Sequence, residues 1–294
     1  MFEDNAEFGF GILKAKNLAR ENLKNFVREN LNNFDDKLKD IVSTWLENFD
    51  NAKICNQIYF DLKQKTNLKN SQNTFLFDNL DSITKSAVWA IGGDGWAYDI
   101  DFGGLDHILA SGENIKILVL DTEVYSNTGG QMSKSTPRNA IASFANNGKK
   151  TAKKRLPLFA MAHKNVYVAQ VCLGADMNQT LKAFEEAQDF DGPSLILAYA
   201  PCINHGIKMT DNIQTQIDAV NCGYWPLFRF NPALKTPLVL DSKITTNFDE
   251  YLLKERRFAN FAEKFGANNF EKTKEDSIEF FELLQKLSKA LNKN

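Results

Sequence analysis

Two patterns of apolar and polar residues divide the chain near Ala87. From about Ile12 to Ser86, apolar residues recur at helical spacing with charged residues between them. A mostly polar stretch at 67–73 interrupts this pattern and predicts a loop. The sequence therefore predicts a mainly helical N-terminal segment over residues 1–86.

From Ala87 onward, short apolar runs replace the helical spacing. The runs lie at 88–91, 115–120, 166–172 and 195–200. Such runs are typical of strands that are buried on both faces of a parallel sheet. Between the last two runs, residues 178–189 predict an amphipathic helix with Leu181, Phe184 and Ala187 facing inward. Alternating strands and helices predict an α/β domain over 87–235, with a mostly parallel sheet flanked by helices.

The last part of the chain returns to helical spacing. Asn231-Pro232 and Thr236-Pro237 indicate a turn region. Beyond it, residues 247–265 and 274–291 predict two surface helices. We therefore expect a helical C-terminal extension over 236–294.

Composition excludes several classes of function. Of 294 residues, 43% are hydrophobic and 24% are charged, and the net charge is −2, so nothing indicates nucleic-acid binding. The acidic start lacks a signal peptide, and no apolar run approaches the roughly 20 residues of a membrane helix. The four cysteines form no Cys-x-x-Cys, which favours a reducing cytoplasm over a disulfide framework. We expect a cytoplasmic protein that binds neither membrane nor nucleic acid.

A carboxylate between glycines follows the first predicted strand, in Gly92-Gly93-Asp94-Gly95-Trp96. Glycines let the backbone approach phosphate oxygens closely and adopt positive φ where that is needed. The residues after Gly95 are expected to begin a helix whose free N–H groups also face the anion. By itself, a Gly-Asp-Gly tripeptide more often marks a turn.

A second group of oxygen donors, after the predicted strand 115–120, changes that interpretation. Mg²⁺ takes about six oxygens, only one or two of them from protein side chains. Asp94 offers a carboxylate, Thr122 a hydroxyl and Val124 a main-chain carbonyl. Because two strand ends deliver these groups to one edge of a sheet, the sequence predicts a site for Mg²⁺ and a diphosphate. That combination points to thiamine diphosphate (TPP).

The run from Trp89 to Gln131 resembles the TPP-binding domain of pyruvate:ferredoxin (or flavodoxin) oxidoreductases. General TPP enzymes have an Asn where this chain has Thr122, and the oxidoreductase family has Thr there. Segments 2–9, 201–206 and 223–229 resemble other parts of the same family. The family's module opens with a Cys-x-x-Cys-Gly-Glu segment and a Gly-Cys segment, both upstream of the match to Phe2. The resemblance therefore implies the C-terminal piece of a longer protein, either truncated or a split subunit.

The resemblance implies roles for individual residues. Asn127 is expected to contact the substrate near the thiazolium and to be catalytic, although its surroundings also suit an ordinary turn. The expected Mg²⁺ ligands are Asp94, Thr122 and Val124. The expected cofactor-binding residues are Gly93, Asp94, Gly95, Trp96, Thr122, Glu123, Val124, Tyr125, Ser126 and Asn127.

Cys202 is implied to be one of four ligands of a [4Fe–4S] cluster, with the other three ligands matching nothing in this chain. From its own position, Cys202 is equally open to description as a buried thiol. His205 close by is either a loop histidine or part of the cluster's surroundings. The basic run 149–155 is either a docking surface for an acidic ferredoxin or flavodoxin, or a solvated face.

The function implied is CoA-dependent oxidative decarboxylation of pyruvate, with electrons passed through the cluster to ferredoxin or flavodoxin. A glutamate that the chemistry requires comes from another domain in this family, so we expect the chain to be inactive alone. The complete enzyme is expected to be a homodimer. The alternatives are a different 2-oxoacid oxidoreductase, a TPP-dependent decarboxylase subunit, or a non-catalytic remnant that acts as an interaction module.

Overall fold

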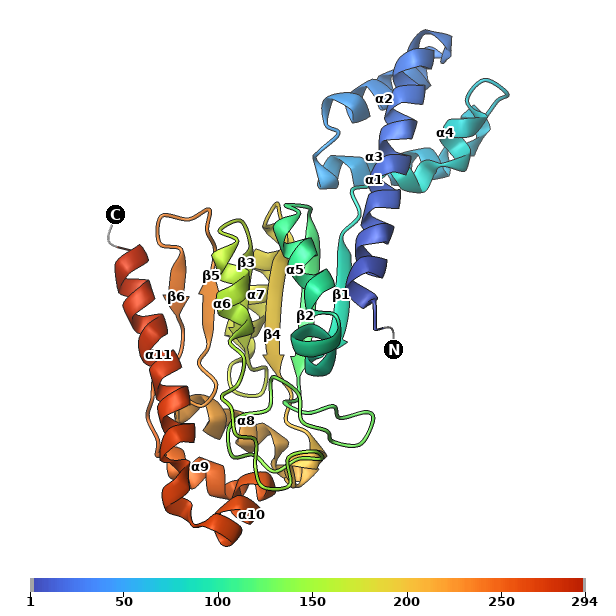
Figure 1. The fold of residues 1–294 in the computed structure, drawn as a ribbon. Coiled ribbons are helices and arrows are strands. Elements are labelled where there is room, and N and C mark those ends of the chain that lie inside the picture. The colour runs from blue at the N-terminus through green and yellow to red at the C-terminus, as the bar shows by residue number, and fades with distance from the viewer. Residues whose placement is uncertain (1–2, 293–294) are drawn as a thin grey trace. The chain divides into compact units, whose positions relative to one another are not determined.

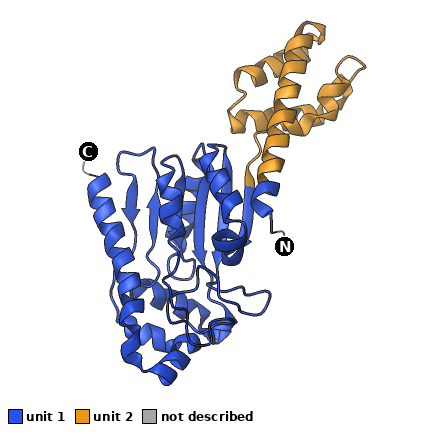
Figure 2. Ribbon diagram, viewed as in Figure 1, with its two compact units in different colours: residues 1–8, 89–294 blue, residues 9–88 orange. Residues whose placement is uncertain are grey.

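The computed structural model describes residues 3–292, which divide into two compact units (Figure 2). One unit comprises residues 9–88, and the other comprises residues 89–292 together with the chain up to Phe8. Among the described residues, every helix is too short or too polar to cross a bilayer.

The unit 9–88 is helical, as the spacing predicts. Its helices are α1 (Asn5–Asn30), whose first turn belongs to the other unit, α2 (Asp36–Glu47), α3 (Ala52–Gln64) and α4 (Thr74–Asp78). Asp35 caps α2 and Asn51 caps α3, each by accepting a backbone N–H with its side chain. The fully buried core includes Leu38 and Trp45, and the Trp45 indole N–H donates to the Ile83 carbonyl at 3.1 Å.

The first residues of the chain contact the α/β unit instead. The Ala6 N–H donates to Asp101 Oδ2 at 2.9 Å, and Asn5 Nδ2 donates to the Ile91 carbonyl at 3.1 Å. The chain up to Phe8 is thereby tied to the unit that follows residue 88, rather than to the helical segment predicted for residues 1–86.

The second unit is built on a six-stranded sheet with the order β1-β2-β4-β3-β5-β6 (Figure 1). The strands are β1 (Val88–Gly93), β2 (Ile115–Asp121), β3 (Tyr167–Val171), β4 (Ser194–Tyr199), β5 (Phe228–Phe230) and β6 (Leu238–Leu240). The first four confirm the predicted apolar runs, and β4 pairs parallel with both β2 and β3. β5 and β6 add an antiparallel edge, so the sheet is mixed.

The unit also contains the helices α5 (Phe102–Ala110), α6 (Leu156–Ala162), α7 (Met177–Asp189) and α8 (Asn212–Asn221). Of these, α6 and α7 pack against β3 and β4. Ala183 and Ala187 of α7 pack against alternate residues of β3. The prediction that Leu181 faces inward is wrong, because this side chain is 55% exposed. Small alanines allow α7 to approach the sheet closely, so the larger residues border the contact.

The C-terminal segment forms three helices rather than two. They are α9 (Phe248–Lys254), α10 (Arg256–Phe265) and α11 (Glu271–Leu291). The predicted helix 247–265 breaks at Glu255, which is extended and buried. The prediction of surface helices is only partly right, since Leu252 and Phe258 are fully buried.

A long irregular segment, residues 122–155, connects β2 to α6. It begins at the carboxyl end of β2, beside the carboxyl end of the parallel strand β4. Irregular segments of this length are uncommon inside compact domains and are usually functional. The segment therefore brings many side chains to the sheet edge where the sequence predicts the site.

Candidate metal and cofactor site

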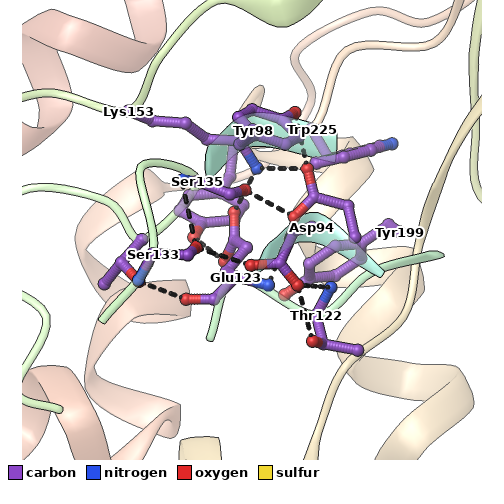
Figure 3. A network of polar contacts seen from close by, with 12 residues as sticks. Asp94, Tyr98, Thr122, Glu123, Ser133, Ser135, Lys153, Tyr199 and Trp225 are labelled. Carbon is purple, nitrogen blue, oxygen red and sulfur yellow. Dashed lines mark hydrogen bonds and ion pairs between the residues drawn. The ribbon is translucent and has the colours of Figure 1, made fainter. Parts of the chain in front are cut away.

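Three oxygens from two strand ends meet at this edge, and Figure 3 shows two of the residues that supply them, Asp94 and Thr122. Asp94 follows β1, and its Oδ1 accepts from the Thr122 hydroxyl at 2.8 Å and from the Thr122 N–H at 3.2 Å. Thr122 Oγ1 lies 2.9 Å from the Val124 carbonyl oxygen. The structure thus brings together the three groups that the sequence predicts as Mg²⁺ ligands.

The spacing of these oxygens fits a magnesium ion. Neighbouring ligands of an octahedral Mg²⁺ lie about 3 Å apart, because each is about 2.1 Å from the ion. The two contacts of Thr122 Oγ1, at 2.8 and 2.9 Å, match two such edges. Within residues 3–292, no group of three His, Cys, Asp or Glu side chains is placed to hold a metal. One carboxylate, one hydroxyl and one carbonyl suit Mg²⁺, leaving positions for phosphate oxygens and water.

Asp94 lies in surroundings that favour its neutral form until a cation arrives. It is 1% exposed, and burial together with the charge of Asp121 raises the pKa of Asp94 to about 7. The Ser133 hydroxyl donates to Asp94 Oδ2 at 2.5 Å and orients the carboxyl group. A divalent cation at the three oxygens would stabilise the ionised form.

The glycines around Asp94 do not need the positive φ that the sequence allows for, but two of them leave room for neighbouring rings. Gly92, Gly93 and Gly95 all lie outside the left-handed region of positive φ. A Cβ atom at Gly92 would lie 2.3 Å from the Trp96 ring, and one at Gly95 would lie 2.3 Å from the Tyr125 ring. Gly92 and Gly95 therefore make room for aromatic rings, whereas a Cβ atom at Gly93 would lie 4.0 Å from the Leu120 carbonyl oxygen, an ordinary contact distance.

The residues after Gly95 do begin a helix, but its first turn is a π-helix over Gly95–Ile100. π-helical turns occur frequently at functional sites. The Trp96 indole N–H donates to Asp101 at 2.5 Å, and the Tyr125 hydroxyl lies 3.4 Å from the Gly95 carbonyl. Both predicted cofactor-binding rings thus pack behind the backbone of the Gly-Asp-Gly turn.

Asn127 lies on a tight exposed loop just beyond the three oxygens. The loop is closed by hydrogen bonds from the Gly130 N–H to the Tyr125 carbonyl and from the Tyr125 N–H to the Gln131 carbonyl, each 2.9 Å. Ser126 and Asn127 are exposed at its tip. The loop therefore carries Asn127 at an exposed position, three residues beyond Val124 in the sequence.

Glu123 does not face the site with its side chain. It is 1% exposed, and its carboxylate binds Lys153 at 2.9 Å, Tyr224 at 2.5 Å and Arg257 at 2.6 Å. Burial opposes ionisation, but the cations of Lys153 and Arg257 lower the pKa of Glu123 to about 2. Only the backbone of Glu123, at φ 57°, remains to border a cofactor.

The Lys153 ammonium connects this carboxylate to a second one at the end of β2. It lies 2.9 Å from Asp121 Oδ2 as well as 2.9 Å from Glu123 Oε1, and 4.6 Å from the centre of the Trp225 ring (Figure 3). Asp121 also accepts from Ser135 at 2.5 Å and from Tyr98 at 2.8 Å. A buried network of ion pairs and hydrogen bonds of this kind supports the loop that carries Thr122 and Val124.

Most basic side chains of the run 149–155 make contacts within the protein, which argues against a fully solvated face. Lys149 is 8% exposed and donates to the carbonyls of residues 134, 136 and 152. The Lys154 ammonium lies 2.9 Å from the centre of the Phe102 ring, and Arg155 donates to the Asp276 carbonyl. Apart from Lys150, which is exposed, these side chains are therefore used to hold the irregular segment together.

Cys202 lies beside the Asn127 loop, on the turn that follows β4. It is partly exposed, whereas Cys55, Cys172 and Cys222 are each 0% exposed. His205 is also 0% exposed, and its Nε2 lies 2.7 Å from the Thr122 carbonyl oxygen. Burial and the charge of Arg257 lower the pKa of His205 to about 4, so the imidazole is neutral. The interpretation of His205 as an ordinary loop histidine is therefore wrong.

Sequence reasoning missed the residues that support the site from a distance. Ser133, Lys153 and Arg257 contact Asp94, Asp121 and Glu123 across 39, 32 and 134 residues of sequence, respectively. Pairs at such separations leave no periodic or motif signal. The one signal available is the pair of carboxylates near the second strand end, Asp121 and Glu123, because buried carboxylates need cationic partners.

The part of the chain that carries this geometry is similar to a known family. Residues 80–198 match the family described as "Thiamine pyrophosphate enzyme, C-terminal TPP binding domain". This region contains Asp94, Thr122, Val124 and Asn127. The match includes β1 and β2, the two strands whose ends carry the three oxygens.

Similarity to individual proteins extends over most of the chain. It is 45% identical over 279 residues to "Pyruvate:ferredoxin oxidoreductase" of Moorella thermoacetica, covering 90% of this chain and 24% of that protein. It is 45% identical to "Pyruvate-flavodoxin oxidoreductase" of Klebsiella pneumoniae, covering 88% of this chain and 23% of the relative. It is 46% identical to "Pyruvate dehydrogenase [NADP(+)], mitochondrial" of Euglena gracilis, covering 88% of this chain and 15% of that protein. The chain thus spans about a quarter or less of the length of these relatives.

Proposed function

Because the chain carries the C-terminal TPP-binding domain of thiamine pyrophosphate enzymes and is homologous to pyruvate:ferredoxin and pyruvate-flavodoxin oxidoreductases, we propose that residues 87–235 bind TPP through Mg²⁺. One observation supports the proposal most directly: Thr122 Oγ1 lies 2.8 Å from Asp94 Oδ1 and 2.9 Å from the Val124 carbonyl oxygen. These three groups hold the ion, and the ion binds the diphosphate. The backbone of Gly93 and Gly95, with Trp96 and Tyr125 behind it, borders the phosphates.

Bound TPP supplies the electron sink for loss of CO₂ from a 2-oxoacid. The chain's own contribution is to hold the cofactor and to orient the substrate. Asn127, exposed on its closed loop, donates a hydrogen bond to the substrate carboxylate or to the oxygen that gains charge. Ser126 on the same loop borders the cofactor.

We propose that the complete enzyme oxidises pyruvate with coenzyme A and passes electrons to ferredoxin or flavodoxin in the cytoplasm. Cys202 supplies one ligand of a [4Fe–4S] cluster, and the other ligands come from a further part of the enzyme. The whole assembly is a homodimer. Thr122 and Cys202 favour this function over a simple TPP-dependent decarboxylase. The experiment below distinguishes it from oxidation of a different 2-oxoacid and from a non-catalytic remnant.

A chimeric enzyme tests the proposal. The matching quarter of the Moorella thermoacetica oxidoreductase is replaced by this chain, and CoA-dependent reduction of a dye by pyruvate is measured. We expect activity in the chimera, and we expect Asn127→Ala to lower kcat by about 100-fold while TPP binding stays near normal. Such a change is typical of a donor that acts on charge developing in the transition state.

Asn146→Ala is the matched control, because Asn146 is an exposed asparagine on the same irregular segment. It should leave kcat unchanged. A folded, TPP-bound chimera without activity would support the non-catalytic remnant, and activity only with another 2-oxoacid would change the substrate. If Asn127→Ala weakened TPP binding and left turnover intact, Asn127 would be a cofactor-binding residue and its catalytic role would be wrong.

The isolated chain should hold no stable [4Fe–4S] cluster. Cys202 is the one partly exposed cysteine of the four, and the three others are fully buried. A cubane cluster needs about four thiolates within reach, which the described residues do not provide. Anaerobic reconstitution followed by iron and sulfide analysis measures this directly. One intact cluster per chain would show that the ligand assignment is wrong.

A further inference from the structure

The turn after β4 presents consecutive side chains to different parts of the site. It comprises Pro201–Gly206, with a short 3₁₀ turn at Ile203–His205, and Gly206 closes it at φ 77°. A Cβ atom at Gly206 would lie 2.2 Å from Arg256 Cβ, so only glycine fits there. The turn is therefore firmly placed at its end, next to the irregular segment that follows β2.

Three side chains leave this turn in three directions. Cys202 is partly exposed and its sulfur lies 3.5 Å from the Asn204 N–H. Asn204 Nδ2 lies 3.5 Å from the Ser126 carbonyl on the loop that carries Asn127. His205 is fully buried and reaches the Thr122 carbonyl at 2.7 Å.

The protonation of His205 follows from its partner. A carbonyl oxygen only accepts, so Nε2 carries the proton and donates to Thr122. Nδ1 is buried without a hydrogen-bond partner among the described residues, and it lies 4.0 Å from Glu255 Oε2. The imidazole therefore has one hydrogen bond. It is made to the carbonyl of Thr122, whose hydroxyl is one of the three oxygens of the site.

We propose that His205 is a positioning residue that ties the turn carrying Cys202 to the metal-binding end of β2. The proposal rests on the proposed function for the role of Thr122. When Thr122 is fixed by the ion, His205 fixes the Cys202 turn as well, and the coupling acts equally in the reverse direction. The hydrogen bond from His205 to the Thr122 carbonyl thereby links cofactor loading to the exposure of the Cys202 sulfur.

Thiol labelling measures this coupling, because Cys202 is the only one of the four cysteines that is not fully buried. The cofactor-free full chain is treated with iodoacetamide and the modification is followed by intact mass. We expect His205→Ala to raise the labelling rate of Cys202 by about 10-fold. The turn that carries Cys202 loses its buried hydrogen bond to Thr122 in this variant, so it opens more often. His205→Gln keeps a donor that can reach the carbonyl, and we expect it to restore the slow rate.

The number of labelled thiols controls for folding. A folded variant labels at one thiol, whereas an unfolded one labels at all four, and Cys202→Ser should remove the fast label. His163→Ala is the matched control, because His163 is bonded to Asp106 away from this turn. Equal Cys202 rates in wild type and His205→Ala would overturn the proposal, as would a His205→Gln variant that labels as fast as His205→Ala.

A second arm separates this proposal from the proposed function. Mg²⁺ and TPP should slow Cys202 labelling in the wild type and in His205→Gln, and leave the rate in His205→Ala unchanged. Calorimetry on the same samples reports TPP binding itself. Binding without any change in labelling would overturn the coupling alone. Absence of binding to the wild type, with the His205→Ala rate still raised, would contradict the cofactor site and keep His205 as the residue that positions the turn.

Discussion

Asp94→Ala is expected to weaken Mg²⁺-dependent TPP binding to the full chain by about 100-fold or more. The variant loses the only carboxylate among the three oxygens, and a charged ligand to a diphosphate-bound ion contributes roughly a few kcal/mol. Calorimetric titration with TPP, with and without Mg²⁺, measures the change. The wild type should bind measurably only when Mg²⁺ is present.

Two further variants separate the charge from the fold. Asp94→Asn keeps the shape of the side chain and an oxygen that can accept from Thr122, and we expect most of the affinity loss to remain. Asp106→Ala removes a carboxylate from α5, where Asp106 is bonded to His163, and should leave TPP binding unchanged. Equal TPP affinity for wild type and Asp94→Ala would exclude Asp94 as a metal ligand.

Arg257→Met is expected to destabilise the α/β unit by about 3–5 kcal/mol. The guanidinium group lies 2.6 Å from both Glu123 and Glu255, and the two carboxylates are 1% and 0% exposed. Removing it leaves Glu255 without its cation and Glu123 with Lys153 alone. Urea unfolding followed by tryptophan fluorescence, with buried Trp225 as the reporter within this unit, measures the free energy of unfolding.

The control is Lys274→Met, which also removes one positive charge. Lys274 pairs with Asp249, but these side chains are 44% and 52% exposed, so the pair contributes less than about 1 kcal/mol. Glu123→Gln combined with Arg257→Met should recover part of the loss, because it removes one of the two buried carboxylates that lose the Arg257 cation. A loss for Arg257→Met no larger than that for Lys274→Met would show that the buried network does not stabilise the site.

The sequence predicts the parts of the fold that repeat a simple pattern. Buried parallel strands are continuous apolar runs, so β1 to β4 are recognisable, whereas β5 and β6 have three residues each and give no such signal. The break between α9 and α10 also escapes prediction. It is caused by Glu255, whose buried carboxylate is held by Tyr251 and Arg257. The spacing of apolar residues contains no information about such a polar contact.

The residues of the site also fall into a group that the sequence predicts and a group that it does not. Asp94, Thr122 and Val124 are predictable because strands that run parallel bring their carboxyl ends to one edge. The supporting cations are not, because Lys153 and Arg257 resemble any surface residue until the fold places them beside Asp121 and Glu123. The basic run 149–155 shows the consequence. Charge alone predicts a solvated surface, whereas Lys149 is buried and Lys153 is paired with Asp121 and Glu123.

The central claim is that Asp94, Thr122 and Val124 hold the cation that binds the TPP diphosphate. The most direct test is a crystal structure of the full chain with TPP and Mn²⁺ in place of Mg²⁺, because anomalous scattering locates the manganese independently of the protein atoms. We predict one strong peak within coordination distance of the Asp94 carboxylate, the Thr122 hydroxyl and the Val124 carbonyl, with phosphate oxygens completing its ligands. A diphosphate bound elsewhere, or a metal peak away from these three oxygens, would contradict the account.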